Sequence, residues 1–194
     1  MNRRSAIALG LLLMGSAFTG PSDAAQNSKY VTLLDGKSMG DFTPIGNANW
    51  RVVDGAVYAD RGNGFLVSKQ SYADFHLRAE VWVDEPANSG IFIRCENPQN
   101  VSGQSSYEVN IFDTRPDQSY GTGSIVNVAK VSPMPHAANK WNVMEITAKG
   151  PLMVITFNGK VSTSGTDPKH PRGRIALQYG GGVVKFRKVE IMPL

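Results

Sequence analysis

The segment SSYEVNIFD places two carboxylates and an amide in one short predicted strand. Val109 and Ile111 alternate with Glu108 and Asn110, so the polar pair is expected on the strand face opposite the apolar pair. A β-bulge at the end of the strand would turn Asp113 to the face of Glu108. Glu108 and Asp113 are therefore candidate catalytic acids or bases, and Asn110 is a candidate substrate-binding residue.

Arg94 and Asn88 belong to a neighbouring predicted strand, in the segment ANSGIFIRCE. Alternation places Arg94 beside Phe92, where its guanidinium could hold a negative charge that develops during a reaction. The alternative for Arg94 is an ordinary ion pair with Glu108 across the two strands. Asn88 could contact a ligand, or it could serve only as a turn residue before Gly90.

Three further residues complete the predicted binding set. Gln178 alternates with Leu177 in its strand, so its amide is expected on the face of Ala176 and could bind a ligand. Trp82 falls on the polar side of its strand and could stack on a ligand ring, with packing at a sheet edge as the alternative. His136 lies in a loop that could border the site.

The sequence predicts no metal site. The three histidines show neither His-x-His nor His-Glu-x-x-His spacing, which are spacings typical of metal ligands. No cofactor is predicted, and the sequence is silent on a divalent ion. Cys95 lies in an apolar strand pattern and is interpreted as a small buried residue, since a nucleophilic cysteine would need a His or Asn partner that is not identifiable nearby.

The elements that must position these residues are β-strands. Segments such as DFHLRAEVWV, GIFIRCE, WNVMEITA and GRIALQYG alternate apolar and polar residues, and turn signals such as DEPANSG, FNGK and SGTDPKHPRG separate them. Many short strands at regular spacing, without a helical apolar stripe, predict an all-β sandwich or barrel. Without a repeat or linker, residues 26–194 are expected to form a single domain.

Residues 1–24 are predicted to be a secretory signal peptide. The segment begins with Arg3 and Arg4, continues with an apolar run too short to span a bilayer, and ends in small residues. The protein is therefore expected in the periplasm or outside the cell, with no membrane insertion after the signal is removed. The net charge then falls from +4 to +3 without a basic patch, so a nucleic-acid partner is not expected.

Ten blocks appear in an order that resembles the secreted 3-keto-disaccharide hydrolase family. They include LLDGKSMGDF, WRVVDGAVYA, NSGIFIR, YEVNIFD, WNVMEI, GRIALQ and VKFRKVEI, and they extend over nearly the whole predicted domain. The resemblance implies a concanavalin-like jelly-roll sandwich of two antiparallel sheets, one of which binds carbohydrate on a concave face. It also implies hydrolysis of glycosides whose sugar carries a ketone at carbon 3.

The resemblance implies a chemical role for each candidate catalytic residue. In such chemistry Glu108 would act as base or acid, Arg94 would hold an enolate or a hydroxyl, and Asp113 would be a second acid or base or would orient Arg94. The spacing Glu-x-Asn-x-x-Asp is similar to Glu-x-Asp-x-x-Glu of laminarinase-type glucanases but departs from it at two positions. A non-catalytic carbohydrate-binding module and a structural envelope or adhesion domain remain the alternatives.

Overall fold

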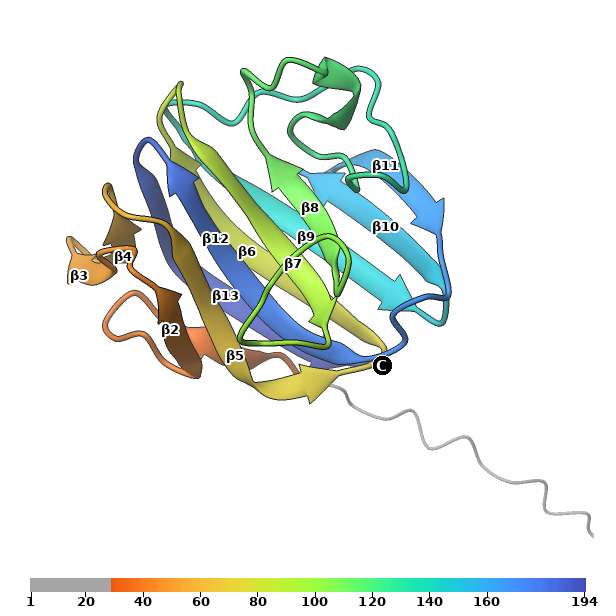
Figure 1. Ribbon diagram of the computed structural model, residues 1–194, viewed down its shortest axis with the longest axis horizontal. Helices are drawn as coiled ribbons and strands as arrows, with labels where there is room; N and C mark the ends of the chain where they lie inside the picture. Colours follow the sequence, from red (N-terminus) through yellow and green to blue (C-terminus); the bar gives the residue numbers. More distant parts are fainter. Residues whose placement is uncertain (1–28) are drawn as a thin grey trace, which may run out of the picture.

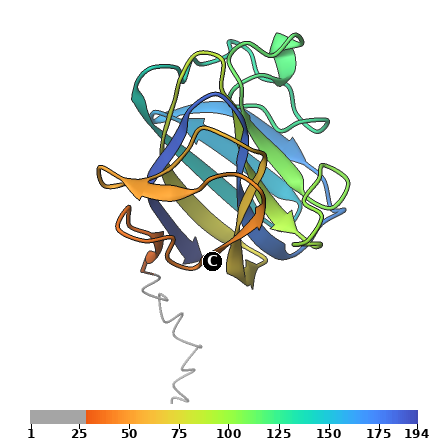
Figure 2. The same ribbon diagram turned by 60° about the vertical axis from the view of Figure 1, so that its left-hand side comes forward.

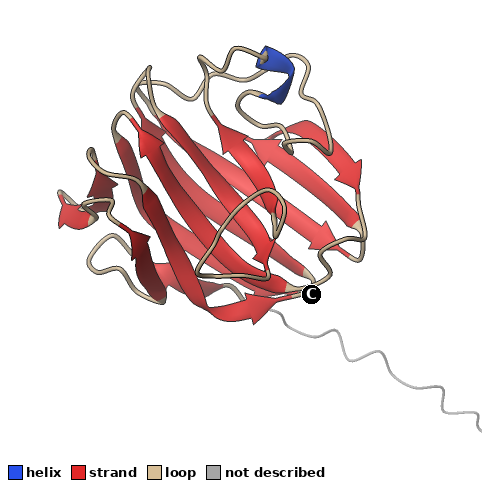
Figure 3. Cartoon of the chain, viewed as in Figure 1, coloured by secondary structure: helices blue, strands red, loops and turns tan. Residues whose placement is uncertain are grey.

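The computed structural model describes residues 29–194, so the predicted signal peptide lies outside the described residues. This part of the chain consists of strands, with one short 3-10 helix, η1, in a loop (Figure 3). The elements are β1 (Val31–Leu34), β2 (Phe42–Gly46), β3 (Arg51–Val53), β4 (Ala56–Ala59), β5 (Gly64–Tyr72), β6 (Phe75–Val83), β7 (Asn88–Cys95), β8 (Tyr107–Ile111), η1 (Gln118–Tyr120), β9 (Trp141–Lys149), β10 (Leu152–Phe157), β11 (Lys160–Thr166), β12 (Gly173–Gly181) and β13 (Val184–Pro193).

The strands form two antiparallel sheets. An eight-stranded sheet has the order β11-β10-β9-β6-β13-β4-β3, with β1 also paired to β13, and a five-stranded sheet has the order β2-β5-β12-β7-β8. The five-stranded sheet is the front layer in Figure 1, and Figure 2 shows the two layers from the side. The prediction of an all-β jelly-roll sandwich is confirmed.

The core lies between the inner faces of the two sheets. Alternate residues of β6, including Leu77, Ala79 and Val81, are fully buried against inward residues of the five-stranded sheet such as Ile91 and Val109. Each large apolar side chain buried in this way contributes about 1.5–3 kcal/mol to folding. The period-two pattern of the sequence therefore determines which residues face the opposite sheet and which face outward.

Two hairpins turn at residue pairs that end in glycine, and the first of them is the predicted turn FNGK. Asn158 and Gly159 have φ angles of 49° and 78°, and Asp54 and Gly55 have 49° and 74°. Positive φ at both central residues is the requirement of a type I′ turn, which suits the twist of the flanking strands.

Two connections border the outer face of the five-stranded sheet. The loop between β7 and β8 lies in front of this sheet in Figure 1, and its Val101 packs on outward residues of the sheet. The longer connection between β8 and β9 carries η1 and lies beyond the end of β8. Among residues 29–194, no helix is long and apolar enough to cross a membrane.

Candidate active site

Glu108 lies on the outer face of the five-stranded sheet. Its neighbours in β8, Tyr107 and Val109, belong to the core between the sheets, so the intervening side chain points outward. Glu108 is paired with Phe92 of β7, and Phe92 belongs to a separate apolar cluster with Val67 and Ala176. The predicted face of Glu108 is confirmed, and the carboxyl group sits beside an apolar floor.

A second row of residues crosses the same outer face next to Glu108. Gln178 of β12 is paired with Gly90 of β7, and Gly90 is paired with Asn110 of β8. The backbone N–H of Asn110 donates to Ser124 O at 3.1 Å, which continues the row beyond β8. The predicted faces of Gln178 and Asn110 are therefore confirmed, while their roles as ligand-binding residues stay predictions.

The environment of Glu108 favours its protonated form. Burial raises the pKa of the Glu108 carboxyl above its ordinary value, and the positive charge of Arg115 partly opposes this shift. A carboxyl group with a raised pKa is suited to general acid or base chemistry near neutral pH.

Arg115 was missed by the sequence analysis. It lies in the connection after β8, where no strand periodicity predicts the direction of a side chain, and its backbone N–H donates to Phe112 O at 3.4 Å. The only available signal was a basic residue placed shortly after the carboxylate-bearing strand. Arg115 is therefore the arginine whose positive charge acts on the pKa of the Glu108 carboxyl.

The prediction that Arg94 shares the outer face with Phe92 is wrong. Arg94 has a φ of 53°, which breaks the strand alternation, and only 1% of its side chain is exposed. Its guanidinium donates to Gly150 O at 2.7 Å and pairs with Asp74 at 3.1 Å. Further bonds to Ala73 O and His170 O complete its set of partners. Arg94 therefore ties together the turns at one end of the sandwich.

The Asp113 carboxylate is held by hydrogen bonds that stabilise the fold. The strand β8 ends at Ile111 and pairs with β7 without a register shift, so no bulge within the strand brings Asp113 beside Glu108. Its carboxylate accepts the backbone N–H groups of Ala137 and Ala138 at 2.8 and 2.9 Å. It also accepts the hydroxyl of Thr122. These bonds fasten the loop before β9 to the end of β8.

We expect Asp113→Ala to lower the free energy of unfolding by about 1–3 kcal/mol, because it leaves buried backbone N–H groups without acceptors. Chemical denaturation of the purified variant measures this loss. The exposed Glu85 provides the control, since Glu85→Ala should stay within about 0.5 kcal/mol of the parent protein. A variant of Asp113 with unchanged stability and no turnover would return this residue to the catalytic set.

Trp82 lies on the opposite side of the molecule from Glu108. It points outward from β6 in the eight-stranded sheet, where Lys185 of β13 sits over its ring at 4.1 Å. Lys185 is also paired with Tyr58, and Trp82 with Trp141, so aromatic and basic side chains form a row across the strands. Such cross-strand pairs stabilise a sheet. Trp82 therefore lies on the other sheet from Glu108, and its role in ligand binding stays a prediction.

Asn88 and His136 stay as predictions of ligand contact. Asn88 begins β7 and alternates with Gly90 and Phe92, which places it toward the outer face, two residues along the strand from Gly90. The side chain of His136 is 73% exposed, and its Nδ1 lies 4.0 Å from the Asp113 carboxylate.

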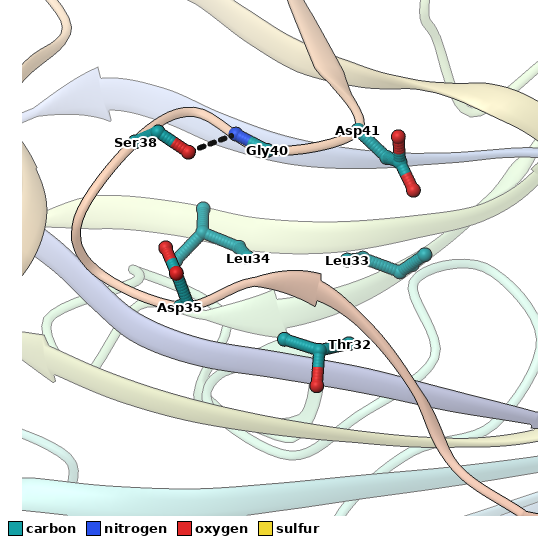
Figure 4. Close-up of a pocket in the computed structure, with 7 residues that line it drawn as sticks. All are labelled: Thr32, Leu33, Leu34, Asp35, Ser38, Gly40 and Asp41. Carbon is teal, nitrogen blue, oxygen red and sulfur yellow. Dashed lines mark hydrogen bonds between the residues drawn. The ribbon is translucent and has the colours of Figure 1, made fainter.

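A separate pocket lies in the connection between β1 and β2 (Figure 4). Two of its polar side chains are occupied by the turn itself, because Ser38 accepts the N–H of Gly40 at 3.1 Å and Asp35 accepts the N–H of Lys37 at 2.9 Å. The outer face around Glu108 is the better candidate for function, since it carries the carboxyl group whose pKa is raised by burial. Within residues 29–194, no cluster of three or more His, Cys, Asp or Glu side chains could hold a metal ion.

The fold is shared with solved structures of low sequence identity. A presumed glycosyl hydrolase from Parabacteroides distasonis matches with a TM-score of 0.76 and 17% identity, covering 85% of this chain and 94% of the other. A second from the same organism matches with a TM-score of 0.72 and 22% identity, covering 86% and 100%. The carbohydrate-binding module CBM66 of Bacillus subtilis matches with a TM-score of 0.62 and 16% identity, covering 82% and 96%.

These similarities establish the jelly-roll architecture, which is found in glycosyl hydrolases and carbohydrate-binding modules alike. No curated protein matches the chain. The model of the 3-keto-alpha-glucoside-1,2-lyase-like domain matches residues 29–192, which is nearly all of the described chain. The chain therefore belongs to the family of 3-keto-alpha-glucoside-1,2-lyase-like domains.

Proposed function

We propose that this protein is an exported enzyme that cleaves 3-keto-glycosides by elimination followed by hydration. The observation that carries the proposal is the position of Glu108, whose carboxyl group points outward from β8 beside the apolar cluster that contains Phe92, where burial raises its pKa and the charge of Arg115 lowers it. Family membership supports the substrate class, and the predicted signal peptide supports export.

The chemistry requires one base and one positive group. A ketone at carbon 3 makes the hydrogen on carbon 2 acidic, and the Glu108 carboxylate accepts that proton. The electron pair forms an enolate, whose negative oxygen Arg115 stabilises. The enolate then expels the oxygen on carbon 1, which leaves with a proton, and water adds its hydroxyl to carbon 1 and a hydrogen to carbon 2.

A double-displacement glycosidase fits this face less well. That mechanism uses two carboxyl groups about 5–5.5 Å apart. The Asp113 carboxylate is held by three donors at the end of β8, and Arg115 is the single charged group that shifts the pKa of Glu108. One carboxylate with one arginine supports elimination from an activated ketone instead.

The test compares an aryl 3-keto-glucoside that releases a coloured phenol with its unoxidised parent, each with and without a chelator. We expect release from the keto compound alone, at the same rate in both conditions. Release from both compounds would point to an ordinary glycosidase. Release from neither compound would favour the second candidate function, a carbohydrate-binding module. In that case the polar row beside Glu108 would bind carbohydrate without catalysing a reaction.

We expect Arg115→Met to lower kcat on the keto-glucoside by about 10²–10³-fold, because one preorganised positive group at the enolate oxygen is lost. Arg115→Lys should retain part of the rate, since it keeps a positive charge. The exposed Arg61 offers a matched control, and Arg61→Met should turn over normally. A normal kcat in Arg115→Met would remove this residue from the mechanism.

A further inference from the structure

A mostly apolar pocket lies between the β10–β11 hairpin and the loop of residues 132–135 (Figure 1). Its volume is about 330 Å³, and its apolar lining residues are Pro133, Met134, Pro135, Phe157 and Val161. Phe157 is 4% exposed and closes the inner side, whereas Val161 is 66% exposed and lies at the opening. Because β10 and β11 belong to the eight-stranded sheet, this pocket is distinct from the outer face that carries Glu108.

Hydrogen bonds connect the two walls of the pocket. Ser162 Oγ of β11 donates to Gly123 O at 2.9 Å, in the same connection as the loop. Asn142 joins the hairpin turn to the end of the loop, because it accepts from Asn158 Nδ2 at 2.9 Å and donates to Ala137 O at 2.8 Å. A pocket whose walls are fixed in this way is preformed, so a ligand binds without first ordering the protein.

The loop also packs closely on the backbone beneath it. A Cβ atom at Gly121 would collide with Met134 Sδ, and one at Gly123 would lie 3.1 Å from Pro135 Cγ. Glycine at these two positions therefore leaves the room that the loop side chains occupy. The loop has a defined position against the domain, and its proline and methionine side chains form one wall of the pocket.

Lys160 supplies the charge of the pocket. It lines the pocket and is exposed, and within residues 29–194 it forms no salt bridge. The other polar lining residues, Ser132 and Ser162, are uncharged. A complementary ligand is therefore apolar where it meets Phe157 and negatively charged where it meets the ammonium group at the opening.

We propose that this pocket binds a flat apolar carboxylate, such as an aromatic acid of one or two rings. Aromatic rings pack well against methionine sulfur and against the edge or face of phenylalanine. An apolar cavity of about 150 Å³ holds benzene, so a pocket of about 330 Å³ has room for a second ring. Lys160 would pair with the carboxylate. The site is independent of the reaction proposed for Glu108.

Calorimetry with 2-naphthoate tests the chemistry of the site. We expect one molecule bound per chain with a Kd of roughly 0.1 mM, as suits a ligand of this size. Lys160→Met keeps an apolar side chain and removes the charge, so it should weaken binding about fivefold. The neutral 2-naphthamide should bind equally to the parent protein and to Lys160→Met. The exposed Lys37 provides the control, since Lys37→Met should bind 2-naphthoate like the parent.

Val161→Trp tests the position of the site. Val161 is exposed on the edge strand β11, where an aromatic residue is well accommodated, and an unchanged Tm would show that the fold is retained. The indole should occupy the opening and weaken binding of 2-naphthoate by at least about tenfold. Val52 is 43% exposed on β3, at the opposite edge of the same sheet, so Val52→Trp should bind like the parent.

Four results would overturn the proposal. They are no saturable binding of 2-naphthoate to the parent protein, parent-like affinity in folded Val161→Trp, equal affinity of the parent and Lys160→Met for 2-naphthoate, and competition with the keto-glucoside that Val161→Trp does not relieve. The last result would place 2-naphthoate on the outer face around Glu108 instead. Binding is measured without turnover, so failure of the proposed function would leave the proposal of this pocket unaffected.

Discussion

Glu108→Gln is expected to reduce release of the leaving group from a 3-keto-glucoside by about 10²–10⁴-fold, the contribution of a positioned general base. Glutamine keeps the size and hydrogen-bonding shape of the side chain but cannot accept the proton of carbon 2. Initial rates under saturating substrate measure the effect. A rate equal to that of the parent protein would exclude Glu108 as the base.

At neutral pH, Glu108→Gln should lose activity without losing stability. Burial raises the pKa of Glu108 in the folded protein above the ordinary value of 4.5. Its favourable contribution to stability is therefore complete below that ordinary value and is lost as pH rises through the folded pKa. Glu108→Gln, which carries no charge, should therefore unfold at a Tm equal to or above that of the parent at pH 7. The difference should disappear in acid.

The same pKa shift predicts the acid limb of the pH–rate profile. The proposed base must be ionised, so kcat/KM should rise with pH through the pKa of Glu108, above the ordinary value of 4.5. Arg115→Met should move this limb to higher pH, because the charge that lowers the pKa of Glu108 is removed.

Arg94→Ala is expected to produce the largest loss of stability, about 3–5 kcal/mol, because a buried charged network loses its centre. Asp74 keeps 38% of its side chain exposed, so most of the loss comes from the carbonyl oxygens of Ala73, Gly150 and His170 that the guanidinium serves. Urea denaturation measures the change, with Arg61→Ala as the exposed control. If Arg94→Ala unfolded like the parent protein and failed in turnover, the catalytic prediction for Arg94 would be restored.

Strand alternation predicted most of the fold and the positions of part of the candidate site. It gave the sandwich and the outward faces of Glu108, Asn110 and Gln178, because a period of two fixes the face of every residue in a regular strand. It failed at Arg94, where a positive φ interrupts the alternation. It also failed at Asp113, because the strand ends before that residue.

Two other features depend on tertiary structure that alternation does not contain. The polar side of Trp82 was predicted correctly, but the pattern could not tell which of the two sheets would contain its strand. Arg115 lies in an irregular connection, and its charge lowers the pKa of Glu108 in the folded chain. Ser124 likewise lies opposite Asn110 because of a bulge at Gly123, which no local sequence pattern predicts.

The central claim is that Glu108 removes the hydrogen of carbon 2 before the bond at carbon 1 breaks. A 3-keto-glucoside carrying deuterium at carbon 2 tests this directly, with the released sugar analysed by mass spectrometry at early times. The account predicts that the product has lost its deuterium to solvent and that Glu108→Gln forms almost no product. A product that retains the deuterium would contradict elimination, because it would show direct displacement at carbon 1.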